Sequence, residues 1–420
     1  MTAARPREGA QLAPGGTARS AKGAPSNALL PGATTLGESR QATLGVLGGG
    51  QLGRMFVHAA QAMGYRCVVL DPDAISPAGS VAEKHVKADY LDSFGLAQLA
   101  RDCDAITTEF ENVPAMALES LAGMRIVAPA AAAVAVCQDR AVEKAHFEAA
   151  GVPCAPHAVI TNDIELAAVA PSLLPGILKT SRMGYDGKGQ VRVSTAAELA
   201  QAWADLKRVP CVLEQLLPLR RELSVLVARG ADGQTVNFPV QQNLHRGGIL
   251  AVTEVPAPDV PVEVEKLAVG AARQVAAALE YVGVLCIEFF WLQDGRLVVN
   301  EMAPRPHNSG HWTMNGADVS QFELQVRALV GLPLPEPRQH SASVMLNLLG
   351  DLWFPPAGGP APPAWARVLA LPGTHLHLYG KTEARAGRKM GHLNITAATP
   401  EAAHDVALQA AAILGLPTDF

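Results

Sequence analysis

A glycine-rich turn between a short apolar strand and a helix is the feature that most constrains this fold. The stretch "TLGVLGGGQLGRM", Thr43 to Met55, places Gly48, Gly50 and Gly53 in a G-x-G-x-x-G pattern. This pattern is typical of a strand–turn–helix unit whose helix N-terminus binds an anion. A second strand, "YRCVVLDPD", reaches Asp71, about where a dinucleotide-binding fold keeps its ribose-binding acid. Taken alone, the pattern leaves an NAD-dependent oxidoreductase open.

The order of predicted strands and helices divides the rest of the chain. Strands and helices alternate up to "RIVAP", which predicts a doubly wound parallel sheet of the Rossmann type. The sequence then becomes rich in strands and hairpins, and the proline-rich "GLPLPEP" precedes a last small unit. The fold class expected is therefore α/β and α+β. We expect a disordered tail over 1–41, the Rossmann-like domain over 42–138, a second domain over 139–335 with a lid subdomain at about 155–220, and a small β-rich domain over 336–420.

Composition excludes several classes of function. The formal net charge is −5 and basic residues form only short clusters, so no nucleic acid partner is expected. No apolar run reaches the length of a membrane span. Residues 1–41 are mainly Ala, Gly, Pro and Ser and lack the apolar core of a secretory signal, so a disordered tail is favoured over a transit peptide.

The cysteines point to a reducing compartment. None of the six lies in a C-x-x-C pair, and most sit inside apolar runs. They are therefore interpreted as small buried hydrophobic residues and not as a disulfide framework or a zinc site. A cytoplasmic location follows from this interpretation.

The hairpin from Leu285 to Glu301 carries the clearest chemical signal. Asp294-Gly295 predicts a two-residue turn, and counting outward from it pairs Gln293 with Arg296, Leu292 with Leu297, Phe290 with Val299, and Glu288 with Glu301. Like charges directly opposite one another destabilise a sheet, so the two glutamates need a shared proton or a cation. Carboxylates suit Mg²⁺, and Asn300 adds another oxygen. The alternative is a longer loop, which would shift the register and make both glutamates ordinary.

Three further polar clusters are compatible with a phosphate-handling site. Lys179 ends a strand before the glycine-rich loop "GYDGKGQ", whose backbone N–H groups could approach phosphate oxygens. "RPHNSGHW" follows the glutamate hairpin, and "KTEARAGRKMGHLN" supplies cations for a phosphomonoester. Each cluster taken separately is equally typical of a solvated loop.

The ordered set of motifs resembles one family within the ATP-grasp superfamily. "GGGQLGRM", "TTEFENV", "QDR", "GYDGKGQ", "NLHRGGI", "GVLCIEFF", "NEMAPRPHNSGHW" and "GRKMGHLN" look like the ATPase subunit of phosphoribosylaminoimidazole carboxylase, a family also called N5-carboxyaminoimidazole ribonucleotide synthetases. The resemblance covers Thr43 to the C-terminus. It implies an ATP-grasp fold behind a pre-ATP-grasp domain, a C–N-forming ligase, and a homodimer.

The reaction implied by the resemblance belongs to purine biosynthesis. ATP phosphorylates bicarbonate to carboxyphosphate, and the amine of 5-aminoimidazole ribonucleotide then takes the carboxyl group, directly or as released CO₂. The sister formate-dependent glycinamide ribonucleotide transformylase, or another ATP-grasp ligase, is the closest alternative. An NAD-dependent oxidoreductase and a nucleotide-binding regulatory protein without turnover are more distant alternatives.

The resemblance also assigns site residues. The nucleotide contacts implied are Arg140, Lys179, Gly184, Tyr185, Asp186, Gly187, Lys188, Gly189, Gln190, Glu214, Gln215, Leu216, Leu217, Glu222, His245, Asn300 and Glu301. The ligands of Mg²⁺, or alternatively Mn²⁺, are Glu288 and Glu301. The ribonucleotide contacts are Gln51, Leu52, Glu111, Asn308, Lys381, Arg388 and Lys389, and the catalytic residues are Lys179 together with Arg305 and His307 beside bicarbonate. The glycine turn would then face the phosphoribosyl substrate, and Asp71 would only cap a strand end.

Overall fold

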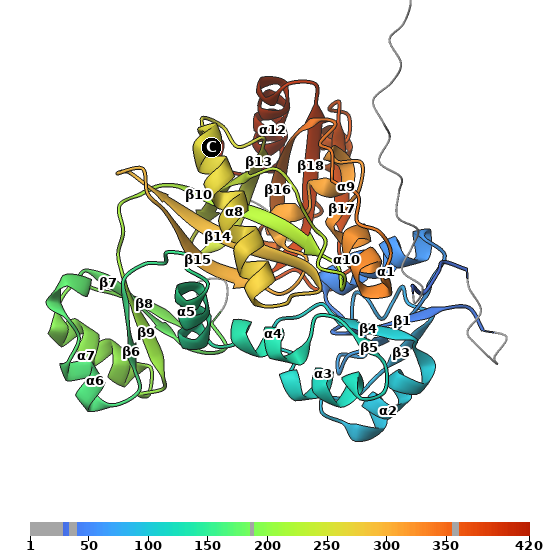
Figure 1. Ribbon diagram of the computed structural model, residues 1–420. Helices are drawn as coiled ribbons and strands as arrows, with labels where there is room; N and C mark the ends of the chain where they lie inside the picture. The colour runs from blue at the N-terminus through green and yellow to red at the C-terminus, as the bar shows by residue number, and fades with distance from the viewer. Residues whose placement is uncertain (1–27, 33–39, 185–188, 355–360) are drawn as a thin grey trace, which may run out of the picture.

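The computed structural model describes residues 28–32, 40–184, 189–354 and 361–420. Within these residues the chain forms three sheets, seen together in Figure 1. The arrangement is α/β in the N-terminal region and α+β in the remainder, as the sequence predicts.

The N-terminal sheet is parallel, with strand order β3-β2-β1-β4-β5. Its central strands β1 and β4 are buried throughout, and helices α2 and α3 cover one face while α1 covers the other. A later helix, α10, packs beside α1 and joins this domain to the rest of the chain. The bounds are β1 (Thr43–Leu47), α1 (Gln51–Ala62), β2 (Arg66–Leu70), β3 (Lys84–Val86), α2 (Ser93–Asp102), β4 (Ala105–Thr108), α3 (Ala115–Ala122), β5 (Ile126–Val127), α4 (Ala131–Cys137), α5 (Arg140–Ala149) and α10 (Gln321–Val330).

A small antiparallel sheet, ordered β6-β9-β7-β8, forms the lid subdomain in green in Figure 1. Its core consists of apolar strand residues packed against Leu199, Ala202 and Trp203 of α7. Two chain crossings, before β6 and after β9, connect it to the body of the protein. The bounds are β6 (His157–Ile160), α6 (Asp163–Ala167), η1 (Pro171–Leu173), β7 (Gly176–Thr180), β8 (Gln190–Val193), α7 (Ala196–Asp205) and β9 (Cys211–Gln215).

The largest sheet has nine strands along the path β15-β14-β10-β12-β13-β16-β18-β17, with β11 paired to β10. Helix α8 packs on one face of β10 and β14, and α10 packs on the other. The bounds are β10 (Leu219–Arg229), β11 (Thr235–Asn237), β12 (Gln241–Arg246), β13 (Ile249–Val255), α8 (Val262–Ala278), β14 (Gly283–Leu292), β15 (Leu297–Ala303), η2 (Asn308–Gly310) and α9 (Thr313–Gly316).

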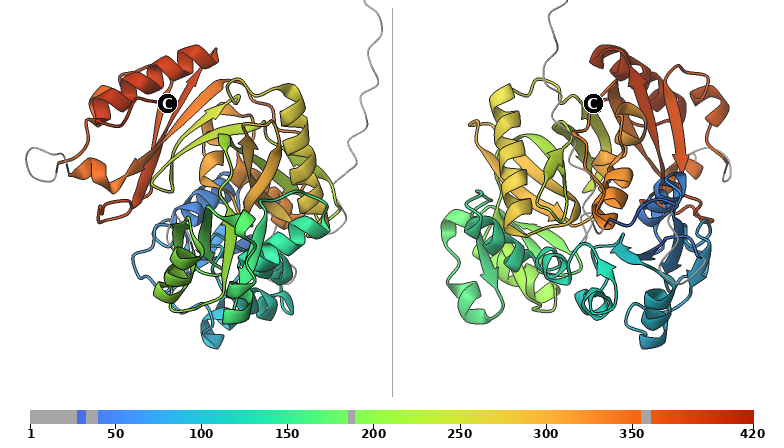
Figure 2. Two further views of the ribbon diagram at one scale, coloured as in Figure 1. Left: turned by 90° about the vertical axis from the view of Figure 1, so that its left-hand side faces the viewer. Right: turned by 45° about the vertical axis from the view of Figure 1, so that its right-hand side comes forward.

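The C-terminal strands continue this sheet. Strand β16 pairs with β13, so the region expected as a separate small domain shares one sheet with the region before it. Helix α12 covers β16 and β18, as the views in Figure 2 show. It packs against them through a row of buried alanines. The remaining bounds are β16 (Ala342–Leu349), η3 (Gly350–Trp353), α11 (Trp365–Val368), β17 (Thr374–Leu378), β18 (Lys389–Ala397) and α12 (Pro400–Leu414).

One short part of the expected N-terminal tail is packed onto the folded protein. The backbone N–H of Leu29 donates to the Val330 carbonyl at 2.9 Å, and the Tyr65 hydroxyl donates to the Leu29 carbonyl at 2.6 Å. The Leu29 side chain joins the core between α1 and α10. Residues 28–32 therefore contact the folded protein through a partly buried leucine and two hydrogen bonds.

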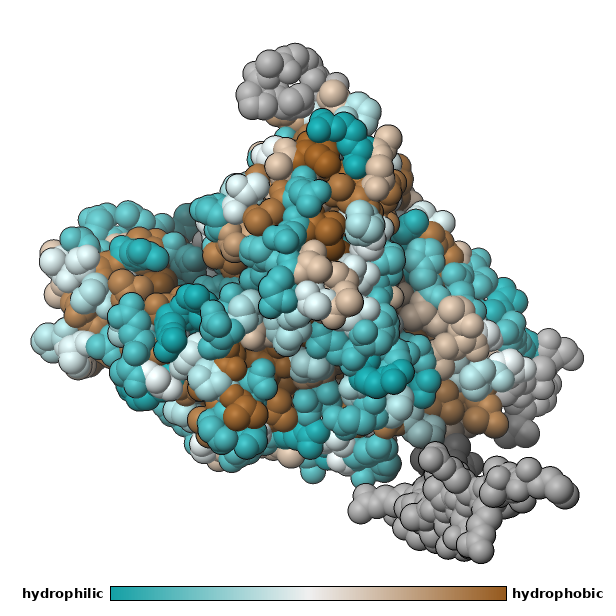
Figure 3. Space-filling view, turned by 90° about the horizontal axis from the view of Figure 1, so that it is seen from above, coloured by the Kyte–Doolittle hydropathy of each residue, from teal (hydrophilic) through white to brown (hydrophobic). Residues whose placement is uncertain are grey.

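None of the helices in the described ranges combines the length and apolar character needed to cross a membrane. The face shown in Figure 3 intersperses hydrophilic residues with smaller hydrophobic areas.

Candidate active site

The hairpin β14–β15 brings Glu288 opposite Glu301, the pairing that the sequence predicts. The route to this pairing differs from the prediction. Next to the turn, Leu292 bonds Arg296 and Phe290 faces Val298, so the expected Leu292–Leu297 and Phe290–Val299 pairs are wrong. The loop holds three residues instead of two, with Gly295 at a φ of +89°. A register shift between Glu288 and Phe289 then restores the expected partner.

This shift is a β-bulge that places Asn300 as an extra residue before Glu301. A bulge turns neighbouring side chains of one strand toward the same side, so Asn300 and Glu301 can both serve one site. The Asn300 backbone carbonyl accepts from Lys144 Nζ at 2.8 Å, which fixes the bulge to α5. The sequence therefore gives the correct carboxylate pair through two irregularities that cancel.

Two cavities meet at this carboxylate pair. The lid cavity, about 700 Å³, lies between the lid subdomain and the large sheet, and the sheet-edge cavity, about 480 Å³, lies at the carboxyl end of the N-terminal sheet. Residues that line both are Arg140, Glu288, Glu301, His307, Asn308 and Lys389.

The cavities separate the residues assigned by the resemblance into two groups. The lid cavity is lined by the nucleotide group Lys179, Gly189, Gln190, Glu214, Gln215, Leu216, Leu217, Glu222, His245 and Asn300. The sheet-edge cavity is lined by the second-substrate group Gln51, Leu52, Glu111, Arg305, Lys381 and Arg388. Gly184 lines the sheet-edge cavity instead of the lid cavity. Tyr185, Asp186, Gly187 and Lys188 lie outside the described residues.

Burial and charge separate the two central carboxyls. Burial and the neighbouring Glu301 raise the pKa of Glu288 to about 7. Burial also acts on Glu301, but Arg140 and Lys179 lower its pKa to about 2, with Arg140 Nη1 donating to Glu301 Oε2 at 2.8 Å. Glu301 is thus the fixed negative charge, and Glu288 is the partner that a proton or a cation would neutralise.

Two buried lysines hold Glu214 at the end of β9. Lys179 Nζ donates to Glu214 Oε2 at 3.0 Å, and Lys144 Nζ lies 3.3 Å from Oε1. Burial alone would raise the pKa of Glu214, but Lys179 and Lys144 lower it. Lys179 and Glu214 line the lid cavity, whereas Lys144 is fully buried and acts there through its ion pair with Glu214.

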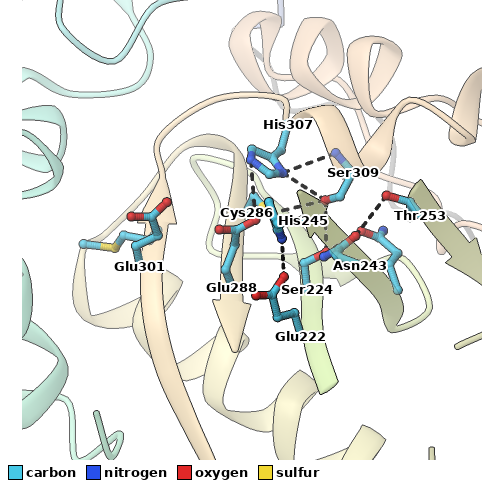
Figure 4. Close-up of polar contacts among 12 residues, drawn as sticks. Glu222, Ser224, Asn243, His245, Thr253, Cys286, Glu288, Glu301, His307 and Ser309 are labelled. Atoms are coloured by element: carbon cyan, nitrogen blue, oxygen red, sulfur yellow. Dashed lines mark hydrogen bonds and ion pairs between the residues drawn. The ribbon is translucent and has the colours of Figure 1, made fainter. Parts of the chain in front are cut away.

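Figure 4 shows the polar groups beside the carboxylate pair. His245 contacts Glu222 directly, and although burial opposes it, Glu222 and Glu288 raise the His245 pKa. His307 Nε2 lies 3.7 Å from Glu288 Oε1, while its Nδ1 lies 2.9 Å from the Ser309 hydroxyl. Burial, followed by Arg305, lowers the pKa of His307 well below its usual value, so its imidazole is neutral.

Arg305 projects into the sheet-edge cavity and pairs with Glu111. Burial opposes its charge, but Glu111 and Glu109 keep its pKa above the usual value. The guanidinium therefore remains charged in a buried site, next to neutral His307, which is an arrangement suited to a small oxyanion.

The glycine turn closes around a side chain of the protein itself. Glu109, just after β4, accepts from Gly50 N at 2.9 Å and from Gly53 N at 3.1 Å. A Cβ added at Gly48, Gly50 or Gly53 would come within 3.0 Å of Glu109. The three glycines therefore make room for this carboxylate, which takes the N–H groups that the pyrophosphate of a dinucleotide would need.

Asp71 has the structural role expected for it. Its Oδ2 accepts from Gly49 N at 2.7 Å and from the Tyr90 hydroxyl at 2.8 Å. Both contacts hold the turn in place, so Asp71 is a strand-end cap and not a free ribose acceptor.

Sequence reasoning missed two residues of this site. Lys144 lies four residues after Arg140 on α5, a spacing that places both on one helix face and could have revealed it. Glu109 directly follows β4 and lies two residues before Glu111, and only the three-dimensional contact with the glycine turn shows its role.

Three domain families match the chain: the ribonucleotide synthetase pre-ATP-grasp domain over 41–138, the ATP-grasp domain over 145–322, and the phosphoribosylaminoimidazole carboxylase C-terminal domain over 343–405. The N5-carboxyaminoimidazole ribonucleotide synthase of Brucella melitensis is 44% identical over 355 residues, covering 84% of this chain and 95% of that protein. The Pseudomonas aeruginosa synthase is 42% identical, covering 84% and 94%.

Solved structures show the same likeness. A crystal structure of an ADP complex of N5-carboxyaminoimidazole ribonucleotide synthetase superposes with a TM-score of 0.83 at 38% identity, covering 93% of this chain and 99% of that one. The Aspergillus clavatus synthase in complex with ADP and 5-aminoimidazole ribonucleotide superposes with a TM-score of 0.80 at 32% identity, covering 89% and 98%.

The three sheets, with two cavities meeting at paired carboxylates, define an ATP-grasp ligase behind a pre-ATP-grasp domain. Because its similarity extends over nearly the whole length of these relatives, the chain belongs to the N5-carboxyaminoimidazole ribonucleotide synthase family.

Proposed function

We propose that this protein catalyses the ATP-dependent carboxylation of 5-aminoimidazole ribonucleotide, with bicarbonate as the carboxyl source. The products are N5-carboxyaminoimidazole ribonucleotide, ADP and phosphate. The observation that carries the proposal is the Glu288–Glu301 pair at the junction of the lid cavity, which Arg140 and Lys179 line, and the sheet-edge cavity, which Arg305 lines. A phosphoryl group bound from one side would there meet an acceptor bound from the other.

ATP would occupy the lid cavity. The end of β9 offers backbone groups at Gln215 to Leu217 beside apolar Phe289 and Phe290, which suits a planar base. Glu222 and His245 offer polar contacts to a ribose, and Lys179 and Arg140 supply positive charge for the phosphates. Gly189, which also lines the lid cavity, would add a backbone donor.

The oxygen ligands at the junction fit Mg²⁺, with Mn²⁺ as an alternative. Glu288 Oε1 and Asn300 Oδ1 are buried and accept no hydrogen bond from any residue in the described part of the chain. A carboxylate and an amide oxygen left in this way are hard donors of the kind that Mg²⁺ prefers. Glu288, Glu301 and Asn300 would hold the ion, which when bound offsets charge on the transferring phosphoryl group.

The groups beside the junction would direct two consecutive displacements. A bicarbonate oxygen attacks the γ-phosphorus and ADP leaves, giving carboxyphosphate; the substrate amine then takes the carboxyl carbon, losing a proton, as phosphate leaves. Arg305 would hold the oxyanion, and His307, neutral because burial lowers its pKa, would contribute a hydrogen bond beside it. The departing phosphate can take up the proton released by the amine. Burial at this junction also protects carboxyphosphate from water.

The ribonucleotide would lie in the sheet-edge cavity. Lys381, Arg388 and Lys389 gather positive charge for its phosphate, although Lys381 Nζ also donates to the Lys389 carbonyl at 2.6 Å. Gln51, Leu52 and Asn308 would contact the ribose and the base. Both side-chain polar atoms of Asn308 are buried without a hydrogen-bond partner in the described ranges, as expected of a substrate contact.

The proposal predicts ADP formation that requires both bicarbonate and 5-aminoimidazole ribonucleotide. ADP release is measured in a coupled assay with each substrate omitted in turn. Equal rates with formate and glycinamide ribonucleotide would identify the sister transformylase instead. Tight binding of NADH without binding of ATP would support an oxidoreductase.

Metal affinity should depend on pH because Glu288 binds a proton where the ion would bind. With its pKa raised to about 7, the affinity for Mg²⁺ or Mn²⁺ should fall by up to about tenfold per pH unit below that value. Chelation by EDTA should abolish ADP release. Mn²⁺ affinity measured by electron paramagnetic resonance between pH 8 and 5.5 checks this, and a constant affinity would contradict it.

We further propose that the enzyme is a cytoplasmic homodimer. The reduced state of all six cysteines in the structure is compatible with that compartment. Sedimentation equilibrium of the purified protein tests the dimer.

A further inference from the structure

A second cluster of metal-binding side chains lies where the lid subdomain joins the body. Glu148 near the end of α5, Cys154 in the following loop, and His157 at the start of β6 bring one carboxylate oxygen, one sulfur and one imidazole nitrogen within 4.8 Å of one another. The cluster borders an open hollow of about 680 Å³ on the surface. It shares no residue with the lid cavity or the sheet-edge cavity.

The geometry is close to that of a tetrahedral zinc site. Cys154 Sγ lies 3.9 Å from His157 Nδ1. Zn–S and Zn–N bonds of about 2.3 and 2.0–2.1 Å at a tetrahedral angle would separate these atoms by about 3.6 Å. The Cys154 sulfur and the His157 nitrogen therefore need to approach by only a few tenths of an ångström to bind the ion. The exposed Glu148 side chain can rotate toward them.

The backbone holds the cysteine and the histidine in this position. Pro153 and Pro156 flank Cys154 and Ala155, which restricts the loop. The Val299 N–H donates to the Pro153 carbonyl at 2.8 Å, which pins the loop to β15. His157 pairs with Glu214 in the lid sheet. The donors are therefore presented by three separate elements before any ion binds.

We propose that Glu148, Cys154 and His157 form a binding site for a borderline or soft divalent cation such as Zn²⁺, with water as the fourth ligand. A thiolate and an imidazole favour Zn²⁺ over Mg²⁺, so this site and the carboxylate site select different ions. Binding releases the thiol proton and requires the neutral imidazole to carry its proton on Nε2, because Nδ1 then binds the ion instead of facing the Ala155 carbonyl at 3.1 Å. The ion would link α5 and β15 of the body to the first strand of the lid subdomain.

The test uses Co²⁺ as a spectroscopic probe on the full chain, with millimolar Mg²⁺ present to fill the carboxylate site. Bound Co²⁺ should give a thiolate charge-transfer band in the near ultraviolet that equimolar Zn²⁺ removes. The band should be absent in Cys154→Ser and unchanged in Cys211→Ser, a control thiol buried in the same subdomain. Glu148→Gln, at an exposed position that folding does not depend on, should weaken Co²⁺ binding at least about tenfold.

Each outcome decides the proposal. A band lost in Cys154→Ser, retained in Cys211→Ser and weakened in Glu148→Gln supports the site. Absence of the band in the unchanged protein, or its persistence in Cys154→Ser, overturns the site. Unchanged Co²⁺ affinity in Glu148→Gln overturns the three-ligand arrangement even if Cys154→Ser fails to fold.

Discussion

Replacement of Glu288 by glutamine should lower ADP formation by about 10³-fold without destabilising the protein. Loss of one of two carboxylates that hold the proposed Mg²⁺ removes several kcal/mol of charge stabilisation at the transferring phosphoryl group. The stability of the metal-free protein should change in the opposite direction and increase. Burial and Glu301 raise the pKa of Glu288 to about 7, so the ionised carboxylate costs stability as pH rises through that value. Glutamine removes this cost, which is on the order of 3 kcal/mol at pH 8 in the metal-free enzyme.

The measurement pairs steady-state ADP release with urea unfolding, both at pH 8. Asp294→Asn is the matched control, because this carboxylate lies in the same hairpin but bonds Arg296 at the exposed turn. The control should retain full turnover. Glu288→Gln with normal turnover would remove the metal assignment, and a large loss of stability would show that the carboxylate pair serves the fold instead.

Acid should destabilise the protein through a stack of buried histidines. The rings of His311 and His377 each lie 4.6 Å from the ring of His392, at the junction of β17, β18 and η2. Burial lowers the pKa of His311 and His392 well below the usual value, and lowers that of His377 to about 4. Because the unfolded chain binds protons below about pH 6.5 and the folded stack does not, each fully buried ring costs about 2 kcal/mol of stability by pH 5.

The test compares the slope of unfolding free energy against pH in two variants. Glu143 and Glu288, whose pKa values are raised to about 7, act in the opposite direction, so the total slope alone is not decisive. His392→Asn should reduce the loss between pH 6.5 and 5 by about one ring's contribution, whatever its effect at neutral pH. His340→Gln, at an exposed position, serves as the control and should leave the slope unchanged. Equal slopes in both variants would contradict this account.

Much of this fold could be predicted because each local pattern, such as the spacing of apolar residues or a turn dipeptide, depends on one short segment of the chain. Alternation of buried strands with amphipathic helices predicted the parallel N-terminal sheet, and the pairing of Glu288 with Glu301 followed from a count along one hairpin. The count succeeded although its turn was wrong, because the bulge at Asn300 added back the residue that the three-residue loop had displaced. Bulges depend on tertiary contacts such as Lys144 with the Asn300 carbonyl, which a strand pattern does not contain.

Contacts between distant segments could not be predicted in the same way. The glycine fingerprint reports that something must approach the backbone closely, but the sequence does not say that the group is Glu109, which lies 56 residues beyond Gly53. The C-terminal strands likewise join the large sheet because β13 pairs with β16. These two strands are separated in the sequence by α8, the β14–β15 hairpin and α10. The roles given to individual nucleotide and substrate contacts stay predictions, and the cavities show only that those residues are gathered in the required places.

The docking of Leu29 between α1 and α10 has a practical consequence for work with shortened versions of this chain. A truncation placed at the start of β1 would keep the whole match to the pre-ATP-grasp domain family, which begins at residue 41. It would nevertheless remove Leu29 from the contact between α1 and α10. The Tyr65 hydroxyl and the Val330 carbonyl would lose their hydrogen-bond partners in the Leu29 backbone. Fusions and cleavage sites are therefore better placed ahead of residue 28.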